Sequence, residues 1–512
     1  MGFMEQLKDT LNKDYNKSVT ENGAVGYRTT GKKLLDLNFQ VSSLRNQNEQ
    51  EIKNKFTDIF YEDKLLAIKW LFYAGDVREG LGERRLFRIG MKYLAENQKE
   101  LAKAVLELVP FYSRWDNLFC LLDSSLCEDI IQIVRRQITE DKQHMSEQKA
   151  VSLLAKWLPS ANASSKETKR LARIMIKKLD ISEKEYRKTL SELRAYLKVV
   201  EVSMSKKEWS QINYAAVPSR ANLIYNQAFL RNDEERRRSY LESLKKGETK
   251  IHAGVLFPHD IVHNYSERLG WAYKLKDLDD TLEELWKALP DYGADSGNTI
   301  CVADGSGSML TTVGGTQISC LDVANALAIY FAERSTGEFR NTYITFSANP
   351  KIVDFSKAVS LREKLEIAKR HNEVANTNIE AVFDLILKTA VKQHMKQEEL
   401  PQNILILSDM EFDACVYCEA QRKLTTELFQ VFAKRYQKKG YRLPRLVFWN
   451  ICSRTGTIPL KENDLGVALV SGFSPNIVKM VLSNAPDPME ALLEQLRAER
   501  YNAVEQAVKD LV

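Results

Sequence analysis

The sequence contains little that would mark a secreted, fibrous, disordered or membrane-spanning protein. Its 512 residues include only 7 Cys, 12 Pro and 22 Gly. An odd number of scattered cysteines does not form a disulfide framework, and so few Pro and Gly exclude a collagenous or linker-dominated chain. No apolar run approaches the ~18 residues that span a bilayer. The first residues, MGFMEQLKDTLNKDY, lack the apolar stretch of a secretory signal. We expect a soluble, cytoplasmic protein with no membrane partner.

Familiar catalytic and cofactor motifs are also missing. There is no Walker A loop, no nucleophile elbow and no GxGxxG after a strand. Cys415 and Cys418 form a lone CxxC pair, without the second pair that a zinc site needs. His259 and His263 have helical spacing, but Asp260 follows His259, so the HEXXH zinc pattern is absent. These absences favour a binding protein over an enzyme.

Positive charge is concentrated in one part of the chain, although the formal net charge of the whole is only +5. Residues 151–250 hold 22 Lys and Arg against 12 Asp and Glu, a surplus of ten, whereas residues 301–512 hold 25 of each. A local positive field attracts polyanions and makes their binding dependent on salt. A well-solvated helical surface is the alternative explanation.

Two regions with different hydrophobic periodicity follow one another. Up to about residue 290, apolar residues recur at three- and four-residue spacing and short polar breaks separate the helices. Paired helices of this kind predict an α-solenoid of HEAT-like repeats, although no strict internal period is present. From about residue 296, apolar strands such as NILILSD alternate with amphipathic helices, which predicts a doubly wound α/β domain. The predicted domains are 1–293, all helical, 296–484, α/β, and 485–512, a helical tail that packs back.

A set of oxygen-bearing side chains is predicted at one edge of this α/β domain. The first strand ends in Asp304-Gly305-Ser306-Gly307-Ser308, and in open α/β sheets ligands bind at the carboxyl ends of the strands. Thr377 lies in the turn before a later helix, and Asp409 ends the strand NILILSD. Two carboxylates and three hydroxyls suit Mg²⁺, which prefers oxygen ligands and keeps several waters. A Ser-rich turn that merely closes a strand is the alternative.

These residues resemble the metal-ion-dependent adhesion site of von Willebrand factor A-like domains. The match comprises DGSGS at 304–308, Thr377 and Asp409, in the order and on the elements that the family uses. The resemblance implies that Ser306 and Ser308 bind Mg²⁺ or another divalent cation directly. It implies that Thr377 binds directly or through water, and that Asp304 and Asp409 act largely through water. Asn376 and Asn378 depart from the usual Gly and Asp of this family.

A helical N-terminal half followed by such a domain resembles the Ro autoantigen (TROVE) family, and more closely a related family of unknown function with the same layout. The segments that carry this resemblance are REGLGERRLF, FYSRWDNL, LLAKWLPSANASS, KIHAGVLFPHDIV and SDMEFD. The resemblance implies that the helical repeats close into a ring. It also implies that the protein binds misfolded or small non-coding RNA.

Two groups of cations are candidates for contacting RNA phosphates. The first lies at helical offsets 0, 3, 4, 7 and 11, which places its members on one face of a helix: Lys166, Lys169, Arg170, Arg173 and Lys177. The second precedes and begins another helix and consists of Arg78, Arg84, Arg85 and Arg88. The FYSRWDNL segment is expected to pair Arg114 with Asp116 and to bury Trp115.

The sequence therefore predicts a monomeric, non-enzymatic, Ro-like RNA-binding protein with a Mg²⁺-dependent site for an acidic group of a protein partner. The alternative is a protein-binding scaffold that uses the same metal site without nucleic acid. A nuclease or another metal-dependent hydrolase is less favoured, because no general base is evident beside the metal ligands.

Overall fold

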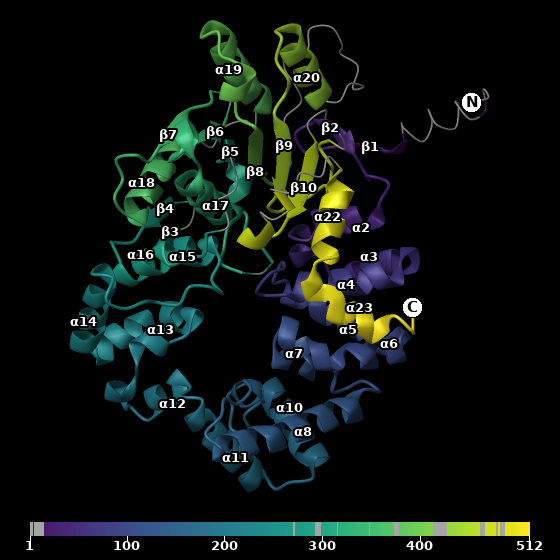
Figure 1. Cartoon of the computed structure of the whole chain (residues 1–512), viewed down its shortest axis with the longest axis vertical. Coiled ribbons are helices and arrows are strands. Elements are labelled where there is room, and N and C mark those ends of the chain that lie inside the picture. Colours follow the sequence, from purple (N-terminus) through teal and green to yellow (C-terminus); the bar gives the residue numbers. More distant parts are fainter. Residues whose placement is uncertain are drawn as a thin grey trace. The chain divides into compact units, whose positions relative to one another are not determined.

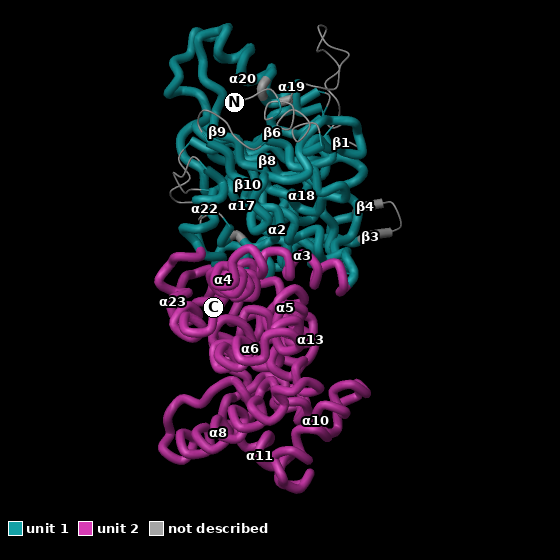
Figure 2. The backbone as a smooth tube through the Cα atoms, turned by 90° about the vertical axis from the view of Figure 1, so that its right-hand side faces the viewer, with its two compact units in different colours: residues 1–48, 256–495 teal, residues 49–255, 496–512 magenta. Residues whose placement is uncertain are grey.

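The structure, a computed structural model, describes residue 4 and residues 15–269, 272–291, 298–314, 316–347, 349–372, 378–412, 428–460, 466–477, 480–481 and 487–512. The chain forms two compact units, each built from segments that are distant in sequence (Figure 2). Residues 1–48 and 256–495 form one, here called the sheet unit. Residues 49–255 and 496–512 form the other, here called the helical unit.

The helical unit follows the predicted pattern of successive short helices (Figure 1). Helix α4 is buried on nearly all sides, because α3, α5, α7 and α23 pack around it. Its elements are α3 (Glu49–Glu62), α4 (Lys64–Gly75), α5 (Arg84–Asn97), α6 (Lys99–Val105), α7 (Val109–Tyr112), α8 (Cys127–Ser146), α9 (Leu154–Trp157), α10 (Lys166–Leu179), α11 (Glu183–Tyr196), α12 (Val200–Ser205), α13 (Ser219–Asn232), α14 (Glu234–Lys245) and α23 (Asn502–Val508), with 3-10 turns that include η3 (Trp115–Asn117), η4 (Phe119–Leu121), η5 (Trp209–Gln211) and η6 (Tyr214–Ala216).

Local sequence signals account for several helix starts in this unit. The Ser165 side chain accepts a hydrogen bond from the Thr168 amide at the start of α10, and Ser182 does the same for Glu185 at the start of α11. Such caps satisfy amides that have no partner inside the helix.

The last residues of the chain complete the helical unit. Arg500 donates to Asp76, from Nε to Oδ2 at 2.5 Å and from Nη2 to Oδ1 at 2.9 Å, and the Asp76 side chain is fully buried. Tyr501 stacks on Tyr112 with ring centroids 5.6 Å apart and donates its hydroxyl to Asp76. Lys69, nearly buried in α4, donates to Glu505 at 2.7 Å. The C-terminal helix α23 therefore packs back on α4 and α6.

The sheet unit is built around a six-stranded mixed sheet of strand order β10-β9-β8-β5-β6-β7. All pairs are parallel except β6 with β7. Its elements are β1 (Lys17–Val19), β2 (Val25–Tyr27), α2 (Lys33–Phe39), α15 (Pro258–Tyr265), β3 (Ser266–Leu269), β4 (Ala272–Leu275), α16 (Asp280–Lys287), β5 (Thr299–Asp304), α17 (Cys320–Arg334), β6 (Thr342–Phe346), β7 (Ile352–Asp354), α18 (Leu361–His371), α19 (Ile379–Lys392), β8 (Asn403–Ser408), α20 (Leu428–Lys438), β9 (Arg445–Asn450), β10 (Val467–Ser471) and α22 (Pro488–Leu496).

Helix α17 is the central helix of this unit and packs against β5, β6, β8 and α15. Residues Cys320 to Ala332 are all buried, as expected for a helix covered on every side. At its start, Ser319 and Asp322 form a capping box, and the buried Asp322 also accepts from Ser266 at 2.8 Å and contacts His263 at 3.2 Å. A helical region followed by an α/β sheet was predicted, and this level of the fold is confirmed.

The expectation that residues 1–290 are purely helical is wrong in two places. Strands β1 and β2 pair antiparallel, as do β3 and β4. The first hairpin turns through residues 20–24, where the Gly23 amide donates to the Thr20 carbonyl at 3.1 Å and Gly23 has a φ of 91°. Asn-Gly between short apolar segments is a hairpin signal, because glycine adopts positive φ without strain.

Packing also groups segments that the predicted boundaries separate. Residues 15–48 and 256–291, assigned from sequence to the helical domain 1–293, pack with the sheet. Ser42 donates to the Asn450 carbonyl at 2.9 Å, and Asn450 donates to the Phe39 carbonyl at 2.7 Å. Compact units and sequence domains need not coincide, so the boundaries 1–293, 296–484 and 485–512 stay a prediction. None of the described helices is both long and apolar enough to cross a membrane.

We predict that Arg500→Ala lowers the free energy of unfolding by about 3 kcal/mol, because it leaves the buried Asp76 carboxylate without its cation. Urea unfolding followed by far-UV circular dichroism measures this loss. The matched control is Arg136→Ala, since Arg136 pairs with Glu107 at the surface, where both side chains are about 60% exposed. Equal, small effects of the two substitutions would contradict the structural role of Arg500.

Candidate functional site

The strand order places two acidic residues at the same edge of the sheet. Strands β6 and β7 extend the sheet on one side of β5, whereas the later strands β8, β9 and β10 extend it on the other side. The strand order therefore reverses between the neighbouring central strands β5 and β8. In parallel α/β sheets this reversal opens a crevice at the carboxyl ends of the strands, where ligands bind. Asp304 is the last residue of β5, and Asp409 directly follows β8.

Four of the five predicted metal ligands come together at this edge of the sheet. The Ser306 amide donates to Asp304 Oδ1 at 2.9 Å, and Ser306 Oγ lies 2.9 Å from Ser308 Oγ. Ser308 in turn is hydrogen-bonded to the Asp409 carboxylate. The fifth predicted ligand, Thr377, lies outside the described residues, as does Asn376. Asn378 caps α19 by accepting from the Ala381 amide at 3.1 Å.

The two carboxylates are buried and repel each other. Asp304 and Asp409 are each 1% exposed. Burial, and then the charge of Asp409, raise the pKa of Asp304 to about 7. Burial likewise raises the pKa of Asp409. Buried like charges that have no cation between them disfavour their ionised forms, and a divalent cation reverses this balance.

Three residues of the site were missed by sequence reasoning. Ser408 donates its hydroxyl to Asp304 Oδ2 at 2.7 Å. Arg454 donates to Asp409 Oδ2 at 3.1 Å and bonds Glu21 at 2.7 Å through its other nitrogen. Glu411 is fully buried two residues after Asp409. The SDMEFD segment contained the signal for Ser408 and Glu411, whereas Arg454 had none.

The Glu411 side chain joins the end of β8 to residues 453–455 and to the N-terminal segment, next to Asp304 and Asp409. Its Oε1 accepts from the amides of Arg454 and Thr455, each at 2.9 Å, and from the Ser453 hydroxyl at 3.1 Å. Its Oε2 accepts from the Glu21 amide at 2.9 Å. Asn22 and Thr20 complete the junction by donating to the carbonyls of residues 411 and 412. The loop that presents Arg454 is therefore held by a carboxylate rather than by regular secondary structure.

The side chains present fit a hard divalent cation. Two carboxylates and two hydroxyls form an all-oxygen set, and Mg²⁺ completes its shell with waters and an external oxygen. Within the described ranges, no three His, Cys, Asp or Glu side chains are grouped to hold a metal. A soft-metal site or a cage made only of carboxylates therefore has no support in the described residues, whereas a site completed by hydroxyls matches the donors found.

The predicted RNA-contacting residues at 78–88 fall into two groups. Arg84 and Arg88 reach the same carboxylate oxygen, Asp116 Oδ2, at 2.8 and 2.9 Å. Arg78 and Arg85 are exposed. The expected pair of Arg114 and Asp116 is present, at 2.8 Å from Nε to Oδ1. Trp115, expected to be buried, is only partly so, because it lies in the short turn η3 rather than in the core.

Of the five cations predicted on α10, Arg170 differs from the other four because it bonds two carboxylates. Lys166, Arg173 and Lys177 are exposed and Lys169 is partly exposed. Arg170 instead forms a bidentate bond with Asp123, at 2.7 and 2.8 Å, and also bonds Glu167. Two carboxylates thus neutralise Arg170, and its contribution to a positive surface is small.

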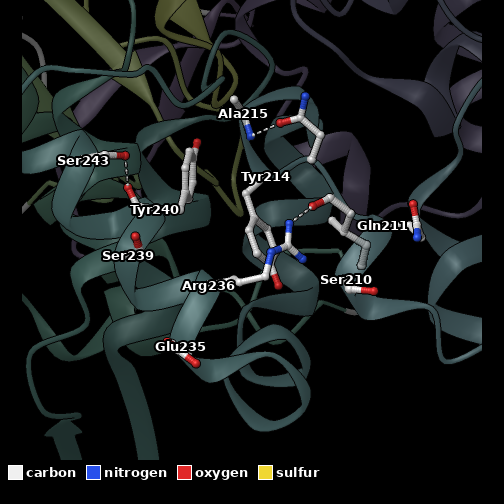
Figure 3. A pocket seen from close by; sticks show the side chains of 11 residues that line it. Ser210, Gln211, Tyr214, Ala215, Glu235, Arg236, Ser239, Tyr240 and Ser243 are labelled. Carbon is white, nitrogen blue, oxygen red and sulfur yellow. Dashed lines mark hydrogen bonds between the residues drawn. The ribbon is translucent and has the colours of Figure 1, made fainter.

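A groove of about 650 Å³ opens between the 210–215 segment and α14 (Figure 3). Arg236 and Tyr214 lie side by side in it, and Tyr240 stacks near Tyr214 at 5.8 Å. The Arg236 guanidinium donates to the carbonyls of Trp209 and Ile212 and to Asp233. The Arg236 donors are therefore bonded to groups of the protein itself. A ligand in the groove would meet mainly hydroxyl and amide groups.

Comparison with known proteins identifies regions of unknown function. Residues 298–510 match the family described as domain of unknown function DUF7788, and residues 124–298 match domain of unknown function DUF2828. The chain is 29% identical over 530 residues to uncharacterized protein L728 of Acanthamoeba polyphaga mimivirus, covering 96% of this chain and 89% of that protein. It also aligns with the crystal structure of the Deinococcus radiodurans RO (RSR) protein at 13% identity and a TM-score of 0.36, covering 92% of this chain and all of that one.

We predict that Glu411→Gln lowers the free energy of unfolding by about 2–3 kcal/mol, because an amide group replaces an oxygen surrounded by donors. Thermal and urea unfolding measure the change. Glu338→Gln, at an exposed carboxylate, is the control and should change stability little. If the two variants unfold alike, Glu411 does not fasten the loop as described.

Proposed function

We propose that this chain is a non-enzymatic binding protein. Its sheet unit captures an acidic group of a protein partner through a divalent cation, and its helical unit binds RNA. The observation that carries the first part is the convergence of Asp304, Ser306, Ser308 and Asp409 at the carboxyl ends of neighbouring strands. The von Willebrand factor A-like assignment, the HEAT-like repeats, Mg²⁺ as the cation, a monomeric state and a cytoplasmic location belong to this proposal.

The chemistry of the site supports capture rather than turnover. Neutral hydroxyls supply part of the ligand shell of a hard cation such as Mg²⁺, which can keep a position for an external carboxylate oxygen. Asp304 accepts from the Ser306 amide and the Ser408 hydroxyl, and Asp409 accepts from Arg454. Both carboxylates are thus engaged as acceptors, which suits orientation of waters and ligand better than proton abstraction.

RNA binding is supported by the exposed cations of α10 together with the surplus of ten positive charges in residues 151–250. Cations that repeat along one helical face track a phosphate backbone. The alternative is a scaffold that uses the metal site alone. Material that absorbs at 260 nm and copurifies at low salt favours RNA, and its absence favours the scaffold.

We predict that Mg²⁺ raises the melting temperature of the protein over an EDTA reference, by about 2–3 °C when it exceeds its dissociation constant 100-fold. Asp304→Asn should abolish this rise, because it removes one of the two facing charges. Asp354→Asn, at an exposed carboxylate of β7, should keep it. A folded wild-type protein whose melting temperature ignores Mg²⁺ and Mn²⁺ would remove the metal site from the proposal.

We predict that affinity for single-stranded RNA falls with salt, with a log–log slope of about −4 if about six phosphates are neutralised. Replacing Lys166, Arg173 and Lys177 with Ala should reduce the magnitude of the slope by about 2, since each neutralised phosphate contributes ~0.7. Arg170→Ala is the matched control, because Asp123 and Glu167 already neutralise that residue. Filter binding across a salt series measures both slopes, and a flat response contradicts polyanion binding.

A further inference from the structure

Three arginines of the helical unit converge on one carboxylate. Arg84 and Arg88 donate to Asp116 Oδ2 at 2.8 and 2.9 Å. Arg114 donates to the same oxygen at 2.6 Å and to Oδ1 at 2.8 Å. Three guanidinium groups carry three positive charges and the Asp116 carboxylate carries one negative charge. The group therefore has a surplus of two positive charges. We call these four residues the arginine cluster.

The surplus is electrostatically unfavourable as it stands. Burial, and then the charge of Arg114, lower the pKa of Arg84 to about 10, and Arg88 and Arg220 act in the same direction. The Nε of Arg84 is buried and has no hydrogen-bond partner among the described residues. Buried donors are nearly always paired, so this cluster holds more donor capacity and more positive charge than Asp116 satisfies.

The cluster is rigid and open to solvent at the same time. The side chains of Arg84, Arg88 and Arg114 are 36%, 34% and 27% exposed. Arg88 also donates from Nε to Asn117 at 2.6 Å, and the buried Asn117 is held by Ser113. The bond from Nε to Asn117 and the bond from Nη2 to Asp116 fix the plane of the Arg88 guanidinium. Preorganised forks of this kind match the oxygens of a phosphate group.

An aromatic surface lies directly beside the cluster. The Arg114 guanidinium stacks 3.8 Å from the centroid of the Trp157 ring, and Lys156 Nζ lies 5.8 Å from that centroid. Trp157 and Trp115 are both only partly buried. Arg114 covers one face of the indole, and the opposite face is the one on which a nucleic-acid base would stack while its phosphate is neutralised nearby.

We propose that the arginine cluster, with Trp157 and Lys156, is a binding site for one nucleotide, in which Arg84, Arg88 and Arg114 hold its phosphate and Trp157 contacts its base. If the nucleotide is part of an RNA, this proposal specifies where the RNA of the proposed function binds, and it rests on that function. A free nucleotide presents the same phosphate chemistry, so the experiment separates the two sources.

The test is a comparison of two probes on the full chain. Fluorescence anisotropy reports binding of a fluorescein-labelled ten-nucleotide single-stranded RNA, and calorimetry reports binding of AMP. We expect the double variant Arg84→Ala with Arg88→Ala to weaken both at least about tenfold, the effect of losing charge-assisted hydrogen bonds. Arg136→Ala, at a surface arginine paired with Glu107, is the matched control and should stay within about twofold.

Two further variants keep the test decisive if the double variant does not fold. Arg88→Lys retains the charge but loses the fork, and should weaken both probes while leaving the melting temperature nearly unchanged. Trp157→Ala should weaken RNA and AMP but not competition by inorganic phosphate, which has no base.

The outcomes separate the nucleotide site from RNA binding in general. If AMP binding depends on the arginines but RNA binding does not, the site stands and RNA is not its ligand. If RNA binds wild type and every cluster variant equally, the site is overturned and RNA binding persists elsewhere on the helical unit. If wild type binds neither AMP nor phosphate nor RNA, the nucleotide site is overturned.

Discussion

Two buried carboxylates that face each other at the centre of a sheet are the constraint around which the sheet unit is organised. Asp304 and Asp409 lie at the ends of neighbouring strands, where burial and mutual repulsion make them costly. The surrounding residues reduce that cost in specific ways. Ser408 and the Ser306 amide donate to Asp304, and Arg454 donates to Asp409. The cation proposed for this site would offset the remaining repulsion between the two carboxylates.

The part of this site that follows from local sequence was predictable. A hydroxyl-rich loop after one apolar strand and an aspartate after another fall at the same edge of a parallel sheet, so the sequence predicts that Asp304, Ser306, Ser308 and Asp409 lie close together. Arg454 and Glu411 were not, because their roles arise only when a loop after β9 meets the N-terminal segment. The hairpin at Asn22-Gly23 did have a local signal, which the helical periodicity around it obscured.

In the helical unit, too, residue spacing predicts which side chains share a helix face, but it does not predict their partners from other parts of the chain. Spacing places five cations on one face of α10, but it does not reveal that Asp123, from outside that helix, neutralises Arg170. Likewise, FYSRWDNL indicates the pairing of Arg114 with Asp116, but not that two arginines of α5 join it. The glycines of REGLGERRLF explain how they do so. A Cβ at Gly80 would lie 2.0 Å from the Tyr73 carbonyl oxygen, and Gly82 has a φ of 71°, so only this tight turn starts α5 where Arg84 and Arg88 reach Asp116.

Each unit closes with residues from the far end of the chain, and this has a consequence for synthesis. Residues 15–48 leave the ribosome first, yet their partners Asn450, Arg454 and Ser471 come more than 400 residues later. Asp76 is likewise 424 residues from its partner Arg500. At about 5–20 residues per second, the nascent segments remain incomplete for roughly 20–100 s. The sheet lacks β9 and β10, and the apolar surface of α4 lacks its partner α23, until these late segments have been synthesised.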